Sequence, residues 1–339
     1  ERWRTARWDS LVANGPAWHD RFPNMGFDDL PPEVFAPKDR IVAYFEAYAK
    51  QINAPIRCGV DVTEVTALPD GAGFRAQTSQ GEIKAKNLVA ATGPFQKPVI
   101  PAVVPDSSGI TQMHSTGYRN PGQLPGGAVM VVGAGASGSQ IADELVRAGR
   151  KVFLSVGPHD RPPIRYRGKD FCWWLGKLGM WDARTKEPGQ EHITIAVSGA
   201  HGGHTVDFRN FAARGMVLLG RAGPFKDGKM QVAGDLQKNI AEGDAHYLSI
   251  LDKADAYAAA HGFDLPEEPE ARQIGPMPAI VTNPLREVDL QAEGITSIIW
   301  ATGFDLDFHW LKVGKFDDRG RPEHTSGISP VPGLYFVGL

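Results

Sequence analysis

Two features of this chain predict an α/β fold with parallel strands, and a third predicts two domains. A glycine-rich loop at 133–138 stands between an apolar run and a helical pattern, and a second apolar run follows that pattern. Two further apolar runs, at 87–93 and 296–303, each end in Ala-Thr-Gly. The chain has 339 residues, 42% of them hydrophobic, which suits two domains with separate cores.

The glycine-rich loop follows a strand predicted over 128–132 and has the spacing G-x-G-x-x-G. This spacing lets the backbone turn tightly, approach a pyrophosphate and pack a helix close to its strand. Apolar residues then recur at helical spacing as far as Ala148, and a second strand is predicted over 151–156. The amides at the start of the helix attract an anion. The stretch therefore predicts a βαβ unit that binds a dinucleotide through Gly133, Gly135, Ala136, Ser137 and Gly138.

The residues after the second predicted strand indicate which dinucleotide binds. Proteins that prefer NAD place an acid about 20 residues past the first glycine, where it bonds the ribose 2′-hydroxyl. Here Ser155-Val156-Gly157 occupy that place, and Arg161, Arg165 and Arg167 follow. Guanidinium groups suit a 2′-phosphate, so we predict NADPH, with Ser155, Arg161 and Arg165 as cofactor-binding residues. The alternative is that these arginines form a solvated basic loop.

Residues 59–91 have the alternating pattern of an antiparallel meander. Turn residues near Asp70 and Gly81 separate its three predicted strands. The stretch 71–76 matches G-x-G-x-x-A, but no helical pattern follows, so we do not predict a nucleotide loop there. The predicted strands cover 59–67, 74–79 and 83–91.

The two Ala-Thr-Gly ends indicate a second nucleotide site. They are Ala91-Thr92-Gly93 and Ala301-Thr302-Gly303. Small residues at a strand end let the backbone approach a flat ligand or a pyrophosphate without a clash. One such end is commonplace, but two of them flank the predicted dinucleotide-binding unit.

This arrangement resembles the flavin-containing monooxygenase family, which includes bacterial flavoproteins and plant-type indole-pyruvate monooxygenases. The resemblance implies two interleaved Rossmann-like dinucleotide-binding domains. The FAD domain would consist of 1–122 and 286–339, interrupted by an NADPH domain at 123–285. The resemblance rests on the following motifs: the loop 133–138, Ala91-Thr92-Gly93 with Pro98 and Pro101, Trp300-Ala301-Thr302-Gly303-Phe304, the closing strand 333–338 and the opening stretch 7–11.

The resemblance also implies where FAD would bind and what the chain lacks. The family's first βαβ unit, with its own glycine loop, would precede residue 1. We therefore expect this chain to be a fragment that binds FAD poorly by itself. The FAD-binding residues implied within the chain are Ala91, Thr92, Gly93, Val62, Ala301, Thr302, Gly303 and Gly338.

The resemblance supplies three candidate catalytic residues. Asn14 resembles the asparagine that family members place beside the flavin and the nicotinamide, where its amide would donate a hydrogen bond. An ordinary Asn-Gly turn is the alternative. His114 and Tyr118 partly match the family's identifying motif, although a histidine at such a place more often orients a linker than transfers a proton. Baeyer–Villiger relatives tend to have Trp-Pro in place of Tyr118-Arg119, so an N- or S-oxygenase is favoured.

The implied function is an NADPH- and FAD-dependent monooxygenase that oxidises a small N- or S-containing, or carbonyl, substrate with O2. By resemblance, oxygen would be transferred from a flavin C4a-hydroperoxide while the protein positions the groups and excludes water. One alternative is an NAD(P)H-dependent flavin reductase that passes electrons to another acceptor. Another is a non-catalytic nucleotide sensor that regulates a partner such as an ion transporter.

Composition excludes several classes of binding partner and cofactor. The net charge is −3 and there is no long basic stripe, so no nucleic acid is expected. No apolar run is long enough to span a membrane. The chain has only two cysteines, without a C-x-x-C motif, which excludes a dithiol reductase and fits a reducing, cytoplasmic compartment. His201-Gly202-Gly203-His204 lacks a third ligand, so no metal is predicted. The aromatic cluster at 171–181 is interpreted as core, as a subunit contact in a homodimer, or as a substrate entrance.

Overall fold

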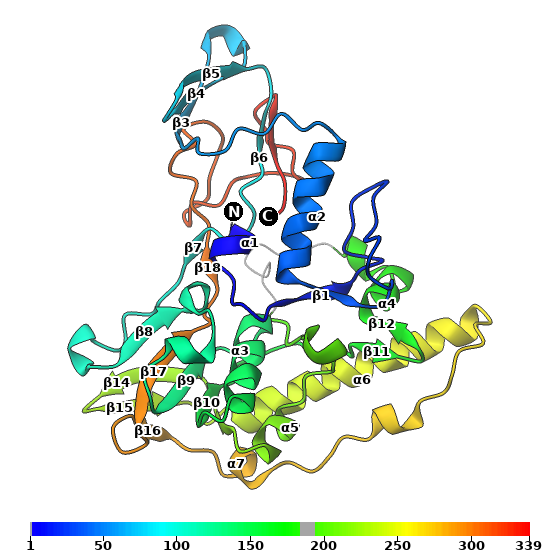
Figure 1. The fold of residues 1–339 in the computed structure, drawn as a ribbon, viewed down its shortest axis with the longest axis vertical. Helices are drawn as coiled ribbons and strands as arrows, with labels where there is room; N and C mark the ends of the chain where they lie inside the picture. The colour runs from blue at the N-terminus through cyan, green and yellow to red at the C-terminus, as the bar shows by residue number, and fades with distance from the viewer. Residues whose placement is uncertain (1, 184–193) are drawn as a thin grey trace. The chain divides into compact units, whose positions relative to one another are not determined.

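The computed structural model describes residues 2–183 and 194–339 (Figure 1). The chain divides into two compact units, which are treated separately below. Unit 1 comprises Glu1–Lys50 and Ile100–Ala301, and unit 2 comprises Gln51–Val99 and Thr302–Leu339. None of the helices in the described ranges has both the length and the apolar surface that a membrane span requires.

Unit 1 is built on a parallel sheet. Each neighbouring pair of its strands runs parallel. Strands are predicted at 128–132 and 151–156, and the structure has strands at 128–132 and 152–155. Every residue of these two strands is buried, as expected for a parallel sheet covered on both faces. Within the described residues the strand order is β13 (Val217–Leu219), β10 (Val152–Ser155), β9 (Ala128–Val132), β17 (Ile295–Trp300) and β8 (Thr111–His114).

Helix α3 (Ala136–Arg147) links β9 to β10 and completes the predicted βαβ unit. Ile141 and Leu145 on this helix are fully buried in the core that includes residues of both strands. Gly149 follows with a positive φ of 78°, as predicted for the residue that ends the helix. Figure 1 shows α3 and the strands it connects, together with the long helix α6 (Leu236–Ala260) of the same unit.

Smaller elements complete unit 1. β1 pairs with β2 and β11 with β12, while β14, β15 and β16 form an antiparallel sheet. The elements are α1 (Arg2–Thr5), β1 (Val12–Pro16), β2 (Phe35–Pro37), α2 (Lys38–Gln51), β11 (Arg165–Tyr166), β12 (Lys169–Asp170), α4 (Phe171–Lys177), α5 (Phe208–Ala213), β14 (Ala222–Lys226), β15 (Lys229–Val232), α7 (Ala279–Thr282) and β16 (Glu287–Asp289).

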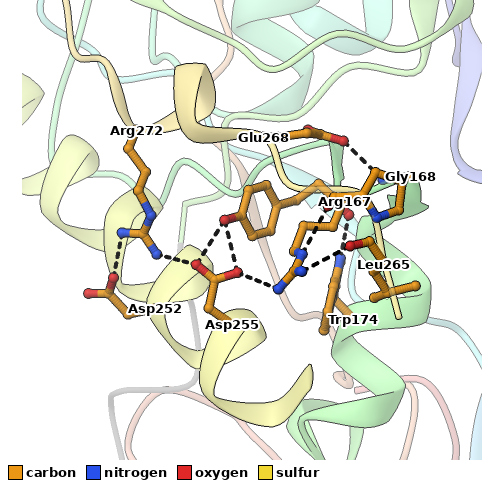
Figure 2. A network of polar contacts seen from close by, with 10 residues as sticks. Arg167, Gly168, Trp174, Asp252, Asp255, Leu265, Glu268 and Arg272 are labelled. Atoms are coloured by element: carbon orange, nitrogen blue, oxygen red, sulfur yellow. Dashed lines mark hydrogen bonds and ion pairs between the residues drawn. The ribbon is translucent and has the colours of Figure 1, made fainter. Parts of the chain in front are cut away.

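A polar network fixes two loops to the C-terminal half of α6 (Figure 2). Arg167 forms an ion pair with Asp255 at 3.1 Å and donates to the carbonyl of Leu265. Arg272 pairs with the same carboxylate at 2.6 Å and with Asp252 at 2.6 Å. Arg167 is therefore engaged within the fold, and the solvated-loop interpretation is wrong for this residue.

The aromatic cluster at 171–181 combines core and surface. Trp174 is fully buried, and its indole donates to the Tyr166 carbonyl at 2.9 Å. Trp181 is half exposed and stacks on His19 with ring centroids 4.9 Å apart. The core interpretation therefore holds for Trp174, whereas Trp181 lies at the surface of unit 1.

Unit 2 contains the predicted meander. Strands β3 (Val62–Ala67), β4 (Phe74–Thr78) and β5 (Gly81–Ala85) pair in antiparallel order. No helix follows Gly71 because β4 starts at Phe74, which confirms the rejection of that stretch as a nucleotide loop. The remaining strands form two pairs, β6 (Leu88–Ala90) with β19 (Leu334–Phe336) and β7 (Lys97–Pro98) with β18 (Phe304–Asp305).

The single strand predicted over 83–91 is wrong, because the chain bends between β5 and β6. β5 pairs with β4, whereas β6 leaves the meander and runs parallel to β19. The Leu88 amide donates to the Gly333 carbonyl at 2.8 Å, which fixes this second pairing. The predicted closing strand, β19, is therefore the partner of β6.

Strand β17 lies in the sheet of unit 1, between β9 and β8. The predicted domain boundary at residue 286 placed this strand with the FAD-binding part, whereas unit 1 extends to Ala301. Compactness does not assign a cofactor to a unit, so the division into an FAD and an NADPH domain stays a prediction.

Candidate functional site

The carboxyl ends of β9 and β17 form the candidate site in unit 1. From β9 the chain passes through α3 to β10 on one side, whereas β17 lies on the other side of β9. In an open parallel sheet, ligands bind beyond the carboxyl ends of the strands at such a reversal of strand order. Gly133 directly follows β9 and Ala301 directly follows β17. The predicted glycine loop therefore lies at the reversal point.

Two glycines of the loop have no room for a side chain. A Cβ on Gly138 would lie 1.8 Å from the Gly133 carbonyl oxygen. Gly133 has a φ of 100°, and its Cβ would lie 2.4 Å from the Ala301 carbonyl oxygen. Two atoms cannot approach so closely, so both positions require glycine. Ala301, the first residue of the predicted Ala-Thr-Gly end, thus packs against the first glycine of the loop.

The start of α3 offers a site for an anion. Gly135 is the N-cap, and the helix that follows has 12 residues with no acidic side chain in its first turn. The first amides of a helix have no partner within the helix, and its dipole attracts negative charge. The predicted cofactor-binding residues Ala136 and Ser137 occupy this first turn. A pyrophosphate therefore suits this helix start, which the backbone of the glycine loop 133–138 lets it approach.

Asn14 lies beside this helix. It is exposed on β1, and its Oδ1 accepts a hydrogen bond from Nε2 of Gln140 at 2.9 Å. Gln140 is buried on α3 and donates a second bond from the same nitrogen to the Val197 carbonyl at 2.8 Å. With its oxygen bound, Asn14 presents its NH2 group to a ligand. The Asn-Gly turn alternative is wrong, because Asn14 and Gly15 belong to a strand.

Residue Gln140 could not be singled out from the sequence. It occurs as one polar residue within the helical pattern after the glycine loop, and its partner is 126 residues earlier. The two amides come together only in the folded chain, where β1 and α3 belong to the same unit.

The contacts of His114 and Tyr118 lie within the fold. His114 ends β8, is buried and accepts a bond from the Thr116 amide at 3.2 Å. The Tyr118 hydroxyl is buried and donates to Oε2 of Glu144 at 2.6 Å. Burial, together with this carboxylate, raises the pKa of Tyr118 far above its ordinary value. These contacts favour structural roles for both residues.

Arg161 is committed to a buried ion pair. It is 3% exposed, pairs with Asp244 at 2.8 Å and lies over the Tyr247 ring. Arg209 pairs with the same carboxylate at 2.5 Å. The guanidinium of Arg161 is therefore enclosed in unit 1, and the solvated-loop interpretation is wrong for it too.

The other residues proposed for the end of β10 have contacts of their own. The Ser155 hydroxyl donates to the Gly220 carbonyl and accepts from the Ala222 amide, both at 2.9 Å. Arg165 is exposed and donates to the Gly202 carbonyl at 2.8 Å. The arginine that lies against the end of β10 is Arg221, which the sequence analysis missed because it follows β13 rather than β10.

Unit 2 brings two of its glycine-containing turns together. Ala91-Thr92-Gly93 follows β6, and Gly338 follows its parallel neighbour β19. A Cβ on Gly338 would lie 3.8 Å from the Cα of Gly93. Thr302 and Gly303 of this unit form hydrogen bonds with the backbone of Val99. Val62 is exposed at the start of β3. The role of these residues in binding FAD stays a prediction.

The two cysteines are free. Burial, followed by the charges of Asp170 and Asp20, raises the pKa of Cys172 to about 12. A thiol with such a pKa is protonated at neutral pH and is a poor nucleophile.

Comparison with known proteins gives a consistent set of relatives. A family model described as pyridine nucleotide-disulphide oxidoreductase matches residues 28–171. An uncharacterized CzcO-like oxidoreductase of Geobacillus kaustophilus is 32% identical over 99% of this chain and 80% of that protein. Indole-3-pyruvate monooxygenase YUCCA1 of Oryza sativa is 27% identical over 99% of this chain and 77% of that protein. A flavin-containing monooxygenase structure from Stenotrophomonas maltophilia aligns with a TM-score of 0.62 at 18% identity, over 99% of this chain and 78% of that chain.

The chain belongs to the flavin-containing monooxygenase-like family of flavoproteins, whose members are flavin-dependent oxidoreductases and monooxygenases. Its mixed α/β fold with a parallel sheet matches the Rossmann-type domains of the Stenotrophomonas maltophilia enzyme. The predicted fold class and the family resemblance are therefore confirmed. The relatives imply flavin and nicotinamide cofactors.

Proposed function

We propose that this protein is an NADPH- and FAD-dependent monooxygenase that oxidises a small N- or S-containing, or carbonyl, substrate with O2. The observation that carries the proposal is the glycine loop 133–138, in which Gly133 and Gly138 have no room for a side chain. It lies at the reversal point of a parallel sheet, beside an oriented and exposed amide. A loop of this kind at a helix start suits a dinucleotide, and the family implies a flavin for the redox chemistry.

The residues of each unit would have separate roles. In unit 1, the loop 133–138 and the start of α3 would hold the pyrophosphate of NADPH. In unit 2, Ala91-Thr92-Gly93 and Gly338 would approach FAD. The family resemblance implies the same role for Thr302, Gly303 and Val62. When bound, the flavin supplies the two-electron and O2 chemistry that side chains lack. The protein contributes binding, orientation and the exclusion of water.

Asn14 is the side chain of unit 1 that we propose for the reaction. An amide hydrogen donated in a fixed direction stabilises negative charge that develops on a reacting oxygen, or orients a carboxamide. Gln140 fixes that direction, because it holds the oxygen of Asn14 and is itself held by the Val197 carbonyl. We propose structural roles for His114 and Tyr118.

Replacing Gln140 with leucine tests this arrangement. We expect Gln140→Leu to lower kcat by up to roughly 100-fold, because Asn14 loses its fixed orientation. The share of consumed NADPH that yields product, rather than hydrogen peroxide, should fall as well. Product and peroxide are measured together in steady state.

The double variant Gln140→Leu/Asn14→Ala is the control. If Gln140 acts through Asn14, the double variant is no slower than Asn14→Ala alone. Effects that add on a logarithmic scale would show that Gln140 acts independently of Asn14.

The function itself is tested with the full-length protein, isotopically labelled O2 and a panel of amines, sulfides and ketones. We expect yellow protein that oxidises NADPH and transfers one labelled oxygen atom to at least one substrate class, detected by mass spectrometry. Consumption of NADPH that forms only hydrogen peroxide with every substrate would contradict oxygenation and identify a reductase. Binding of NADPH without any oxidation would indicate a sensor instead.

A further inference from the structure

The end of β10 is joined to the turn after β13 by side-chain and backbone hydrogen bonds. The Val156 amide donates to the Leu219 carbonyl at 2.8 Å. The buried Ser155 hydroxyl spans the turn, bonding Gly220 on one side and Ala222 on the other. Arg221 stands between these two anchored residues. Its backbone is therefore fixed beside the end of β10.

The side chain of Arg221 passes directly over Gly157. An added Cβ on Gly157 would lie 3.3 Å from Cγ of Arg221, which is tighter than ordinary contact. Gly157 is the second residue after β10, where a dinucleotide-binding fold places the group that contacts the adenosine ribose. This chain has no acid at that place, and the glycine leaves space for the arginine.

Asp235, which precedes α6, orients the guanidinium. One of its carboxylate oxygens accepts the Arg221 amide at 3.0 Å, and the other accepts Nε at 2.6 Å. Burial alone would raise the pKa of Asp235, but the hydrogen bonds from Arg221 lower it below its ordinary value. The carboxylate bonds the side chain at Nε, the Nη1 and Nη2 groups carry further N–H donors, and the side chain is 64% exposed. This pair of donors matches the oxygens of a phosphate.

We propose that Arg221 binds the 2′-phosphate on the adenosine half of the dinucleotide and thereby selects NADPH over NADH. Asp235 is the positioning residue. The inference rests on the proposed function, because it requires a dinucleotide on the glycine loop. It replaces the expectation that Arg161 or Arg165 has this role. Arg161 is enclosed with Asp244, and Arg165 donates to the Gly202 carbonyl.

The test is nucleotide binding by full-length protein carrying its flavin, measured by isothermal titration calorimetry. The probes are 2′,5′-ADP and 5′-AMP, which differ only in the 2′-phosphate. We expect Arg221→Ala to weaken 2′,5′-ADP by roughly 10- to 100-fold while 5′-AMP changes less than about twofold. Arg221→Lys should recover part of the loss, because it keeps the charge without the planar pair of donors.

Lys238→Ala is the matched control. Lys238 is 73% exposed in the first turn of α6, three residues after Asp235, so its removal takes away the same charge without changing Arg221. We expect it to leave both affinities within about twofold. Asp235→Asn should weaken 2′,5′-ADP less than Arg221→Ala does, because the arginine remains but is less well oriented.

Three results would overturn the inference, and they are distinguishable. Unchanged discrimination between the two nucleotides in Arg221→Ala shows that another residue reads the 2′-phosphate. Equal weakening of both nucleotides shows a structural role for Arg221. If wild-type protein binds neither these nucleotides nor NADPH, the proposed function fails as well.

Discussion

Replacing Gly138 with alanine is expected to abolish measurable NADPH binding and to lower stability by about 1–3 kcal/mol. The new Cβ would lie 1.8 Å from the Gly133 carbonyl oxygen and 3.2 Å from the Cβ of Ala301. Neither neighbour can move easily, because the Gly133 amide bonds the Ser155 carbonyl and the Ala301 amide bonds the Val132 carbonyl. NADPH affinity is measured by fluorescence, and stability by thermal unfolding.

Gly126→Ala is the control for this substitution. Gly126 lies just before β9, its φ is not positive, and a Cβ there would meet nothing within 4 Å. The control variant should bind NADPH like wild type. Wild-type NADPH affinity in Gly138→Ala would show that the loop is not the pyrophosphate site.

Replacing Asp244 with asparagine is expected to lower the free energy of unfolding by about 3–5 kcal/mol. Two buried arginines, Arg161 and Arg209, share this carboxylate. Without it Arg161 keeps no carboxylate partner among the described residues, and Arg209 keeps only Asp207 at 3.5 Å. An unpaired charge in a low-dielectric interior is costly. Urea denaturation of the variant gives the measurement.

Glu242→Gln on the same helix is the matched control. Glu242 pairs with Lys238 at 3.7 Å on the exposed face, so its loss should cost less than about 0.5 kcal/mol. Replacing all three charged residues of the buried group with apolar residues of similar volume should restore much of the stability lost in Asp244→Asn. A loss below about 1 kcal/mol in Asp244→Asn would show that water reaches the two arginines.

The parts of the fold that depend on local pattern were predictable from the sequence. The βαβ unit around 133–138 has glycines, an amphipathic helix and apolar strands in one continuous stretch, and each of these signals acts over short range. The meander was predictable for the same reason. The membership of β17 in the sheet of unit 1 was not, because it depends on pairing with β9 across more than 160 residues.

The candidate site was predictable only where backbone conformation defines it. The glycine loop follows from its spacing, and Asn14 follows from a family resemblance. The arginine near the ribose site did not follow, because Arg161 and Arg221 look alike in the sequence. Their ion pairs distinguish the two arginines. Arg161 pairs with Asp244 in the interior, whereas Arg221 pairs with Asp235 and keeps its side chain exposed. Such ion pairs between distant segments have no local sequence pattern.

The position of β17 has a consequence for biosynthesis. A nascent chain that has emerged only as far as β13 carries β8 and β9 without the strand that lies between them. At roughly 5–20 residues per second, that gap persists for several seconds before residues 295–300 are made. During this interval the edges of β8 and β9 that later pair with β17 have unpaired backbone groups and are open to misassociation. Chaperone binding, or ribosome pausing after β13, would therefore affect the yield of folded protein more than changes earlier in translation.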